Sequence, residues 1–105
     1  MTFIKREHPE ARAELREAAF WYDDQQLYLG DDFYDAIEVT IQRVLDWPQA
    51  APVFPGWCEL PVVRSASVNV FPYRVIYYRT DTSVVIVAYA HSRRKPGYWL
   101  HRLDG

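Results

Sequence analysis

Hydrophobic residues in the first half of the chain recur at helical spacing and predict two helices. The first stripe repeats at i, i+4, i+7 and i+11 and comprises Ala11, Leu15, Ala18 and Tyr22. Pro9 stands where a helix can begin, because the first helical turn does not need the N–H that proline lacks. A second stripe of similar spacing comprises Phe33, Ile37, Ile41 and Val44. We therefore expect two successive amphipathic helices.

Glycine, aspartate and proline mark the expected ends of these helices. Gly30 is expected to end the first helix, because glycine readily adopts the left-handed conformation that follows a helix. Asp31 or Asp32 is expected to cap the second helix, and Pro48 is expected to end it. The two helices would then form an antiparallel hairpin.

The second half of the chain is predicted to be rich in β-strands. Residues 48–61 hold four prolines, which remove backbone donors and predict a loop. Strands are expected at residues 62–67, 73–79 and 83–91, and a weakly marked first strand at residues 2–7. The last strand contains an unbroken apolar run from Val84 to Ala88, which is typical of a central strand covered on both faces.

These elements predict a single α+β domain over residues 1–105 with the order β-α-α-β-β-β. The apolar stripes of the helices must be buried, and one face of the sheet is the available surface. We expect the antiparallel two-helix hairpin to pack on one face of a small, mainly antiparallel sheet. The opposite face and the tail after His91 would then be free for a partner or a substrate.

The composition excludes several classes of protein. Half of the 105 residues are hydrophobic and a quarter are charged, as in globular rather than disordered proteins. No apolar run reaches the roughly 18–20 residues of a membrane helix. The N-terminus lacks a signal-peptide pattern, so a cytoplasmic protein is expected. Cys58 stands alone, and His8, His91 and His101 lack metal-ligand spacing, so no disulfide, metal or other cofactor is expected.

The net charge of −2 conceals an uneven distribution. Residues 1–55 carry five basic and eleven acidic side chains, whereas residues 56–105 carry seven basic and three acidic ones. An acidic helical side and a basic sheet or tail side are therefore expected. A basic patch can bind phosphates or an acidic partner even on an acidic protein, although two ordinary solvated faces would show the same distribution.

Residues 91–99, followed by His101 and Arg102, form the densest polar stretch of the chain. Arginine forks bind phosphate oxygens, aromatic rings stack on bases and histidine exchanges protons near neutral pH. Such a set could cleave RNA without a metal. The alternative is a charged strand end after which Tyr98 and Trp99 fold back over the core.

Arg74 lies in the middle of the strand predicted at residues 73–79. Alternation places Arg74, Ile76 and Tyr78 on one face of this strand. An unpaired arginine is costly to bury, so Arg74 should reach solvent, pair with a carboxylate or serve a site. Arg64 lies on the neighbouring predicted strand and is a candidate to face Arg74.

At this point the chain resembles the RelE/ParE superfamily of toxins from type II toxin–antitoxin modules, which includes plasmid stabilisation proteins. The order of elements and the chain length are similar to those of the family. The stretches that carry the resemblance are residues 8–22, 29–33, 71–79 and 90–96. They cover nearly the whole chain in the family's order.

The resemblance implies a small toxin that a cognate antitoxin wraps and neutralises. One branch of the family cleaves mRNA on the ribosome, and another poisons DNA gyrase without acting as a nuclease. Ribosome-directed toxins tend to be strongly basic because counterion release drives nucleic-acid binding, whereas this chain is mildly acidic. The long first helix and the His-x-x-Arg-x-Pro pattern also look more like the gyrase-poison and plasmid-stabilisation branch.

If the chain were a nuclease, the resemblance would assign catalytic roles to four residues. Arg74 holds the arginine position of the family's Tyr-Arg-x-x-Tyr strand, and Arg93 is the best match to a second arginine after the last strand. Trp99 stands where the family has a tyrosine, so the acid or base would be Tyr98 or His101.

The sequence therefore favours a non-enzymatic toxin that binds a protein target such as DNA gyrase. A ribosome-dependent endoribonuclease is the first alternative, and a structural homologue that binds an antitoxin without toxicity is the second. The residues expected to bind a partner are basic or aromatic and comprise Arg64, Arg93, Arg94, Lys95 and Trp99.

Overall fold

The computed structural model describes residues 3–104 and has the predicted order of helices and strands. The elements are β1 (Ile4–Glu7), α1 (Pro9–Gln25), α2 (Leu29–Asp46), β2 (Val63–Ser67), β3 (Tyr73–Arg79), β4 (Ser83–His91) and the 3₁₀ helix η1 (Leu100–Asp104). Thr2, included in the predicted first strand, lies outside the described residues. Within residues 3–104, no helix combines the length and apolar character needed to cross a membrane.

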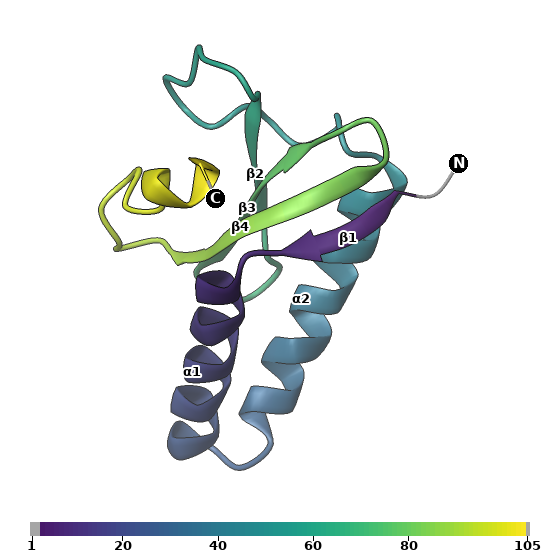
Figure 1. Ribbon diagram of the computed structural model, residues 1–105. Coiled ribbons are helices and arrows are strands. Elements are labelled where there is room, and N and C mark those ends of the chain that lie inside the picture. The colour runs from purple at the N-terminus through teal and green to yellow at the C-terminus, as the bar shows by residue number, and fades with distance from the viewer. Residues whose placement is uncertain (1–2, 105) are drawn as a thin grey trace.

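The four strands form one sheet in the order β1-β4-β3-β2. β1 pairs in parallel with β4, and the other two pairings are antiparallel. Figure 1 shows the two helices extending from one side of this sheet, with the α1–α2 turn at the end far from it. The α+β fold with a mainly antiparallel sheet is confirmed.

The core lies on both faces of the sheet. The α1 and α2 stripes pack on the face that carries Val75, Tyr77 and Val84. On the opposite face, Val63, Ile76 and Val87 are covered by Trp99, Phe54 and other residues of the loop and tail. Both faces of β4 are therefore buried, as its continuous apolar run predicts. Contrary to the expectation, the second face is not free at Val63, Ile76 and Val87, because the tail after His91 folds back over them.

Gly30 does not end the first helix, because α1 already ends at Gln25 and Gly30 lies in the first turn of α2. Its N–H donates a hydrogen bond to Asp23 Oδ1 at 2.7 Å. A Cβ atom on Gly30 would lie 2.5 Å from the carbonyl oxygen of Ala19. The glycine therefore allows α1 and α2 to approach closely.

Asp31 and Asp32 also differ from their predicted role. Both lie in the first turn of α2, where the helix dipole favours negative charge. The N-cap is Tyr28, which has a left-handed conformation with φ of 70° and makes no capping hydrogen bond through its side chain.

Candidate functional site

A cleft of about 600 Å³ lies on the face of the sheet opposite the helices. One wall is the loop at residues 52–55 and the other is formed by residues 90–99, while Arg74 and Ile76 of β3 lie between them. The charged side chains among the lining residues are Arg74, Arg94 and Lys95, all of them cationic. We call this site the cationic cleft. Its combination of apolar walls and positive charge suits an anionic ligand with apolar groups.

Arg74 is half-buried in this cleft and faces the same side of the sheet as Ile76, as the alternation predicts. Its Nε donates a hydrogen bond to Ser65 Oγ at 2.5 Å, and its Nη2 donates to the Ser65 carbonyl oxygen at 3.1 Å. The ion pairs found within residues 3–104 do not include Arg74. Ser65 therefore orients a guanidinium whose charge remains available to an anion.

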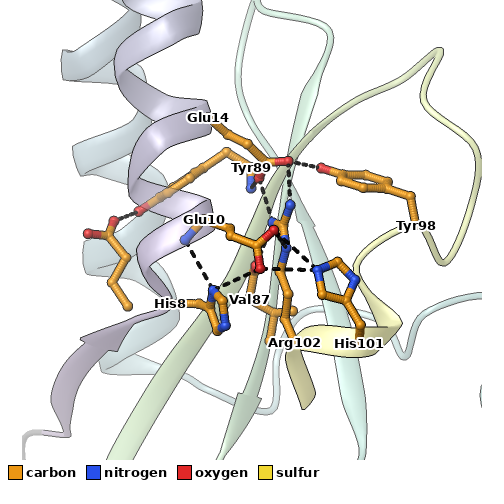
Figure 2. A network of polar contacts seen from close by, with 9 residues as sticks. His8, Glu10, Glu14, Val87, Tyr89, Tyr98, His101 and Arg102 are labelled. Atoms are coloured by element: carbon orange, nitrogen blue, oxygen red, sulfur yellow. Dashed lines mark hydrogen bonds and ion pairs between the residues drawn. The ribbon is translucent and has the colours of Figure 1, made fainter. Parts of the chain in front are cut away.

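Glu14 of α1 binds the tail that follows β4 and forms the second wall of the cleft (Figure 2). The Glu14 carboxylate accepts hydrogen bonds from the Tyr98 hydroxyl at 2.5 Å, from Arg102 Nη1 at 2.9 Å and from Arg102 Nη2 at 3.2 Å. It also accepts one from the backbone N–H of Tyr89 at 3.1 Å. Arg102 further donates to the Val87 carbonyl oxygen at 3.0 Å. We call Glu14, Tyr98 and Arg102 the Glu14 network.

The Glu14 network determines the chemical state of Tyr98. Burial, followed by the hydrogen bond to Glu14, raises the pKa of the Tyr98 hydroxyl well above its usual value. Tyr98 is therefore protonated at neutral pH, and its proton is directed at Glu14. Its ring also lies against cations, with the Arg94 guanidinium carbon 3.9 Å from the ring centroid.

Buried tyrosines are expected to make the protein sensitive to alkali. Burial is the main cause of raised pKa values at Tyr22, Tyr73, Tyr77, Tyr89 and Tyr98. Above about pH 10 the unfolded chain loses phenolic protons that the folded chain retains, so the free energy of unfolding should fall as pH rises. Urea unfolding at pH 8 and at successively higher pH measures this slope. A free energy of unfolding that stays constant up to pH 11 would contradict it.

The four residues that a nuclease would use do not converge. Arg74 and Tyr98 line the same cleft, but the tail arginine that lines it is Arg94 rather than Arg93. Arg93 is exposed, and its backbone N–H donates to His91 Nδ1 at 3.0 Å. His101 lies at the start of α1, where its Nε2 is 3.0 Å from Glu10 Oε2. The hydrogen bond from His101 is the main cause of the lowered Glu10 pKa.

The residues predicted to bind a partner also do not lie together in the structure. Arg94 and Lys95 line the cationic cleft, whereas Trp99 is only 1% exposed and belongs to the core. Arg64 pairs with Tyr77 in the sheet, and Ser67 is the residue opposite Arg74. The Arg64 side chain donates to the Ala51 carbonyl oxygen at 2.8 Å. Arg64 is therefore not across from Arg74, and Trp99 is not accessible to a partner in this conformation.

Glu14 and Arg102 are the structural residues of the site that sequence reasoning missed. Glu14 has the spacing of a helix residue favoured by the dipole, and Arg102 lies in a generally basic tail. The available signal was that both Glu10 and Glu14 lie on one side of α1 at i, i+4 spacing.

Within residues 3–104, no three side chains of metal-ligating type come together.

Comparison with known proteins identifies the family of this chain. Residues 6–96 match the family model described as the ParE toxin of the type II toxin–antitoxin system parDE. A solved structure titled "Chromosomal ParDE TA system from P. aeruginosa" has a similar fold, with a TM-score of 0.60 and 15% identity over 86% of this chain and 96% of that one. No curated protein matches the sequence significantly. The match over most of the chain shows that this protein belongs to the ParE toxin family of type II toxin–antitoxin systems.

Proposed function

We propose that this toxin is neutralised by a cognate antitoxin and that it acts by binding a protein target, DNA gyrase, rather than by cleaving RNA. The family match supports the toxin–antitoxin role. The observation that carries the choice of mechanism is the arrangement of the tail, in which Glu14 binds the Tyr98 hydroxyl and His101 lies away beside Glu10.

RNA cleavage without a metal needs a base near the 2′-hydroxyl and an acid near the leaving oxygen. Tyr98 does not supply the base, because its pKa is raised and its proton is donated to Glu14. His101 does not line the cleft that holds Arg74. Neither of the two predicted acid or base residues is thus placed to exchange a proton beside Arg74, which supports a role for Arg74 in binding an anion.

The same cleft fits an acidic segment of the antitoxin. Its walls include Val53, Phe54 and Pro55, which offer apolar area to a bulky side chain. Arg74, Arg94 and Lys95 offer charge to carboxylates next to that side chain. Charge-assisted hydrogen bonds of this kind are roughly twice as strong as neutral ones. Both the antitoxin and its binding mode are part of the proposal.

Induction of the chain alone in a bacterium tests the mechanism. We expect growth arrest without new RNA 5′ ends inside translated codons, and inhibition of DNA supercoiling by gyrase when purified protein is added. Arg74→Ala tests the nuclease alternative, and Arg79→Ala, at the exposed end of the same strand, is its matched control. New 5′ ends that vanish with Arg74→Ala but persist with Arg79→Ala would establish a nuclease instead.

Co-expression with a candidate antitoxin, to be sought in a short gene next to the toxin gene, tests neutralisation. A cognate antitoxin is expected to restore growth. Arg74→Ala combined with Arg94→Ala should weaken the complex about tenfold or more, because two charge-assisted contacts are lost. Unchanged affinity in this double variant would exclude the cationic cleft as the antitoxin site.

A further inference from the structure

The turn between the two helices exposes an unusual amount of apolar surface. Four large side chains near it are more than half exposed, namely Phe20 (72%), Trp21 (57%), Leu27 (71%) and Tyr28 (67%). Single exposed apolar residues are ordinary on protein surfaces, but several of them around one turn favour an interaction site. Figure 1 places the turn between α1 and α2 at the end of the molecule far from the sheet. We call residues 17–35 the hairpin tip.

The hairpin tip is strongly acidic, in contrast to the cationic cleft. Six carboxylates lie within it and no lysine or arginine does; they are Glu17, Asp23, Asp24, Asp31, Asp32 and Asp35. Asp23 is engaged with the N–H of Gly30, whereas Asp24, Asp31 and Asp32 are exposed. Aromatic rings flanked by carboxylates complement arginine, whose guanidinium stacks on a ring and pairs with a carboxylate.

We propose that the hairpin tip docks onto an arginine-rich, positively charged surface of the toxin's target protein. Trp and Tyr, both present at the hairpin tip, are among the residues enriched in interface hot spots. The carboxylates would attract the basic surface at long range, and the rings would then supply contact area. This inference rests on the proposed function for the existence of a protein target, and on the surface itself for the chemistry of that target.

The placement of the tip also accounts for neutralisation. A second cleft of about 270 Å³ is lined by Trp21 and Glu17 together with Arg94 and Tyr98. Arg94 and Tyr98 line the cationic cleft as well. An antitoxin segment that leaves the cationic cleft past Arg94 therefore reaches Trp21, where it would cover part of the tip.

The test compares two triple variants during induced expression. The tip variant carries Phe20→Gln, Leu27→Gln and Tyr28→Asn. Asparagine is chosen at position 28 because it tolerates a positive φ. The matched control carries Val39→Gln, Leu60→Gln and Val70→Asn, which are exposed by 63%, 87% and 88% and lie elsewhere, with φ of 74° at Val70. Circular dichroism and soluble yield verify that both are folded.

The tip variant should need an expression level at least about tenfold higher to give the same growth arrest. Loss of hot-spot contacts in an interface has an effect of this size. The control should arrest growth like the unchanged protein. Equal arrest by the tip variant, or equal loss in the control, would overturn the proposal. Arrest that depends on the tip without inhibition of gyrase would refute gyrase as the target but support the docking surface.

A binding measurement separates this inference from the proposed function. Purified protein is titrated with poly-arginine, and Asp24→Asn, Asp31→Asn and Asp32→Asn should together weaken binding several-fold, whereas Glu38→Gln and Asp81→Asn should not. If the unchanged protein does not arrest growth, the proposed toxicity fails, and this titration alone tests whether the hairpin tip binds a basic surface. Equal binding of poly-arginine by both sets of variants would overturn the proposed docking surface. Light scattering that shows an oligomer disrupted by the tip variant would instead assign the surface to a second copy of the chain.

Discussion

Replacement of Glu14 by alanine is expected to lower the free energy of unfolding by about 3–5 kcal/mol, as for removal of one partner from a buried ion pair. The side chains of Glu14 and Arg102 are 14% and 6% exposed, so water does not replace the lost carboxylate. The change also leaves the Tyr98 hydroxyl and the Tyr89 N–H without their acceptor. Urea unfolding followed by circular dichroism measures the loss.

A double-variant cycle distinguishes the ion pair from a simple loss of packing. Arg102→Leu in the Glu14→Ala background removes the charge that Glu14→Ala leaves buried, and it should restore part of the stability. A double variant that is less stable by the sum of the two single losses would show that Glu14 and Arg102 act independently. His101→Ala with Glu10→Ala is a suitable comparison, because these side chains are 60% and 51% exposed and exposed pairs contribute little.

Loss of the Glu14 network should also release the tail from α1. Trypsin cleaves after arginine and lysine where no proline follows, and Arg93 and Arg94 are exposed next to the segment that Glu14 holds. We expect cleavage at these residues to become faster in Glu14→Ala before global unfolding is detected. Because residues 90–99 form a wall of the cationic cleft, antitoxin affinity should fall with the same variant.

The strands and helices could be predicted because their signals are local. The alternation at residues 73–79 places Arg74 and Ile76 on one face and Val75 and Tyr77 on the other, and the structure has the same division. The apolar run of β4 likewise predicts burial on both faces. Such patterns follow from the period of each element and need no knowledge of distant residues.

The contacts that assemble the site could not be predicted, because they join residues far apart in the chain. Glu14 binds Tyr98 and Arg102 across separations of 84 and 88 residues. Several acids on α1 and several bases in the tail would satisfy the same charge rule. The role predicted for Gly30 is wrong for a similar reason, since its actual role depends on the close approach of Ala19 in another helix.

Under the proposed function, the two charged surfaces have separate roles: the cationic cleft binds the antitoxin, and the hairpin tip docks onto the target. The acidic hairpin tip belongs to the helical pair, whereas one wall of the cationic cleft is a tail held by the Glu14 network. Variants of Glu14 should therefore affect antitoxin binding more than target docking. Equal losses of both activities at full folding would argue against two separate surfaces.

Replacement of Trp99 by alanine is expected to destabilise the protein by about 3–5 kcal/mol, the usual range for loss of a fully buried tryptophan. Trp99 is 1% exposed, and its ring centroid lies 5.1 Å from Phe54 and 5.8 Å from Trp57. Trp47→Ala is the matched control, because Trp47 is 70% exposed and its loss should change stability by less than about 0.5 kcal/mol.

The comparison of stability with binding decides between a core role and a partner role for Trp99. A core role requires that Trp99→Phe, which retains most of the apolar volume, be far milder than Trp99→Ala in urea unfolding. A residue that instead inserted into the antitoxin would give near-normal unfolding of the free toxin and a selective loss of complex affinity. Because Trp99 fills the space between the loop at residues 52–57 and the sheet, we expect its loss to act on both walls of the cationic cleft through global unfolding. Antitoxin binding by Trp99→Ala should then fall only in proportion to the unfolded fraction and recover under conditions that restore the fold.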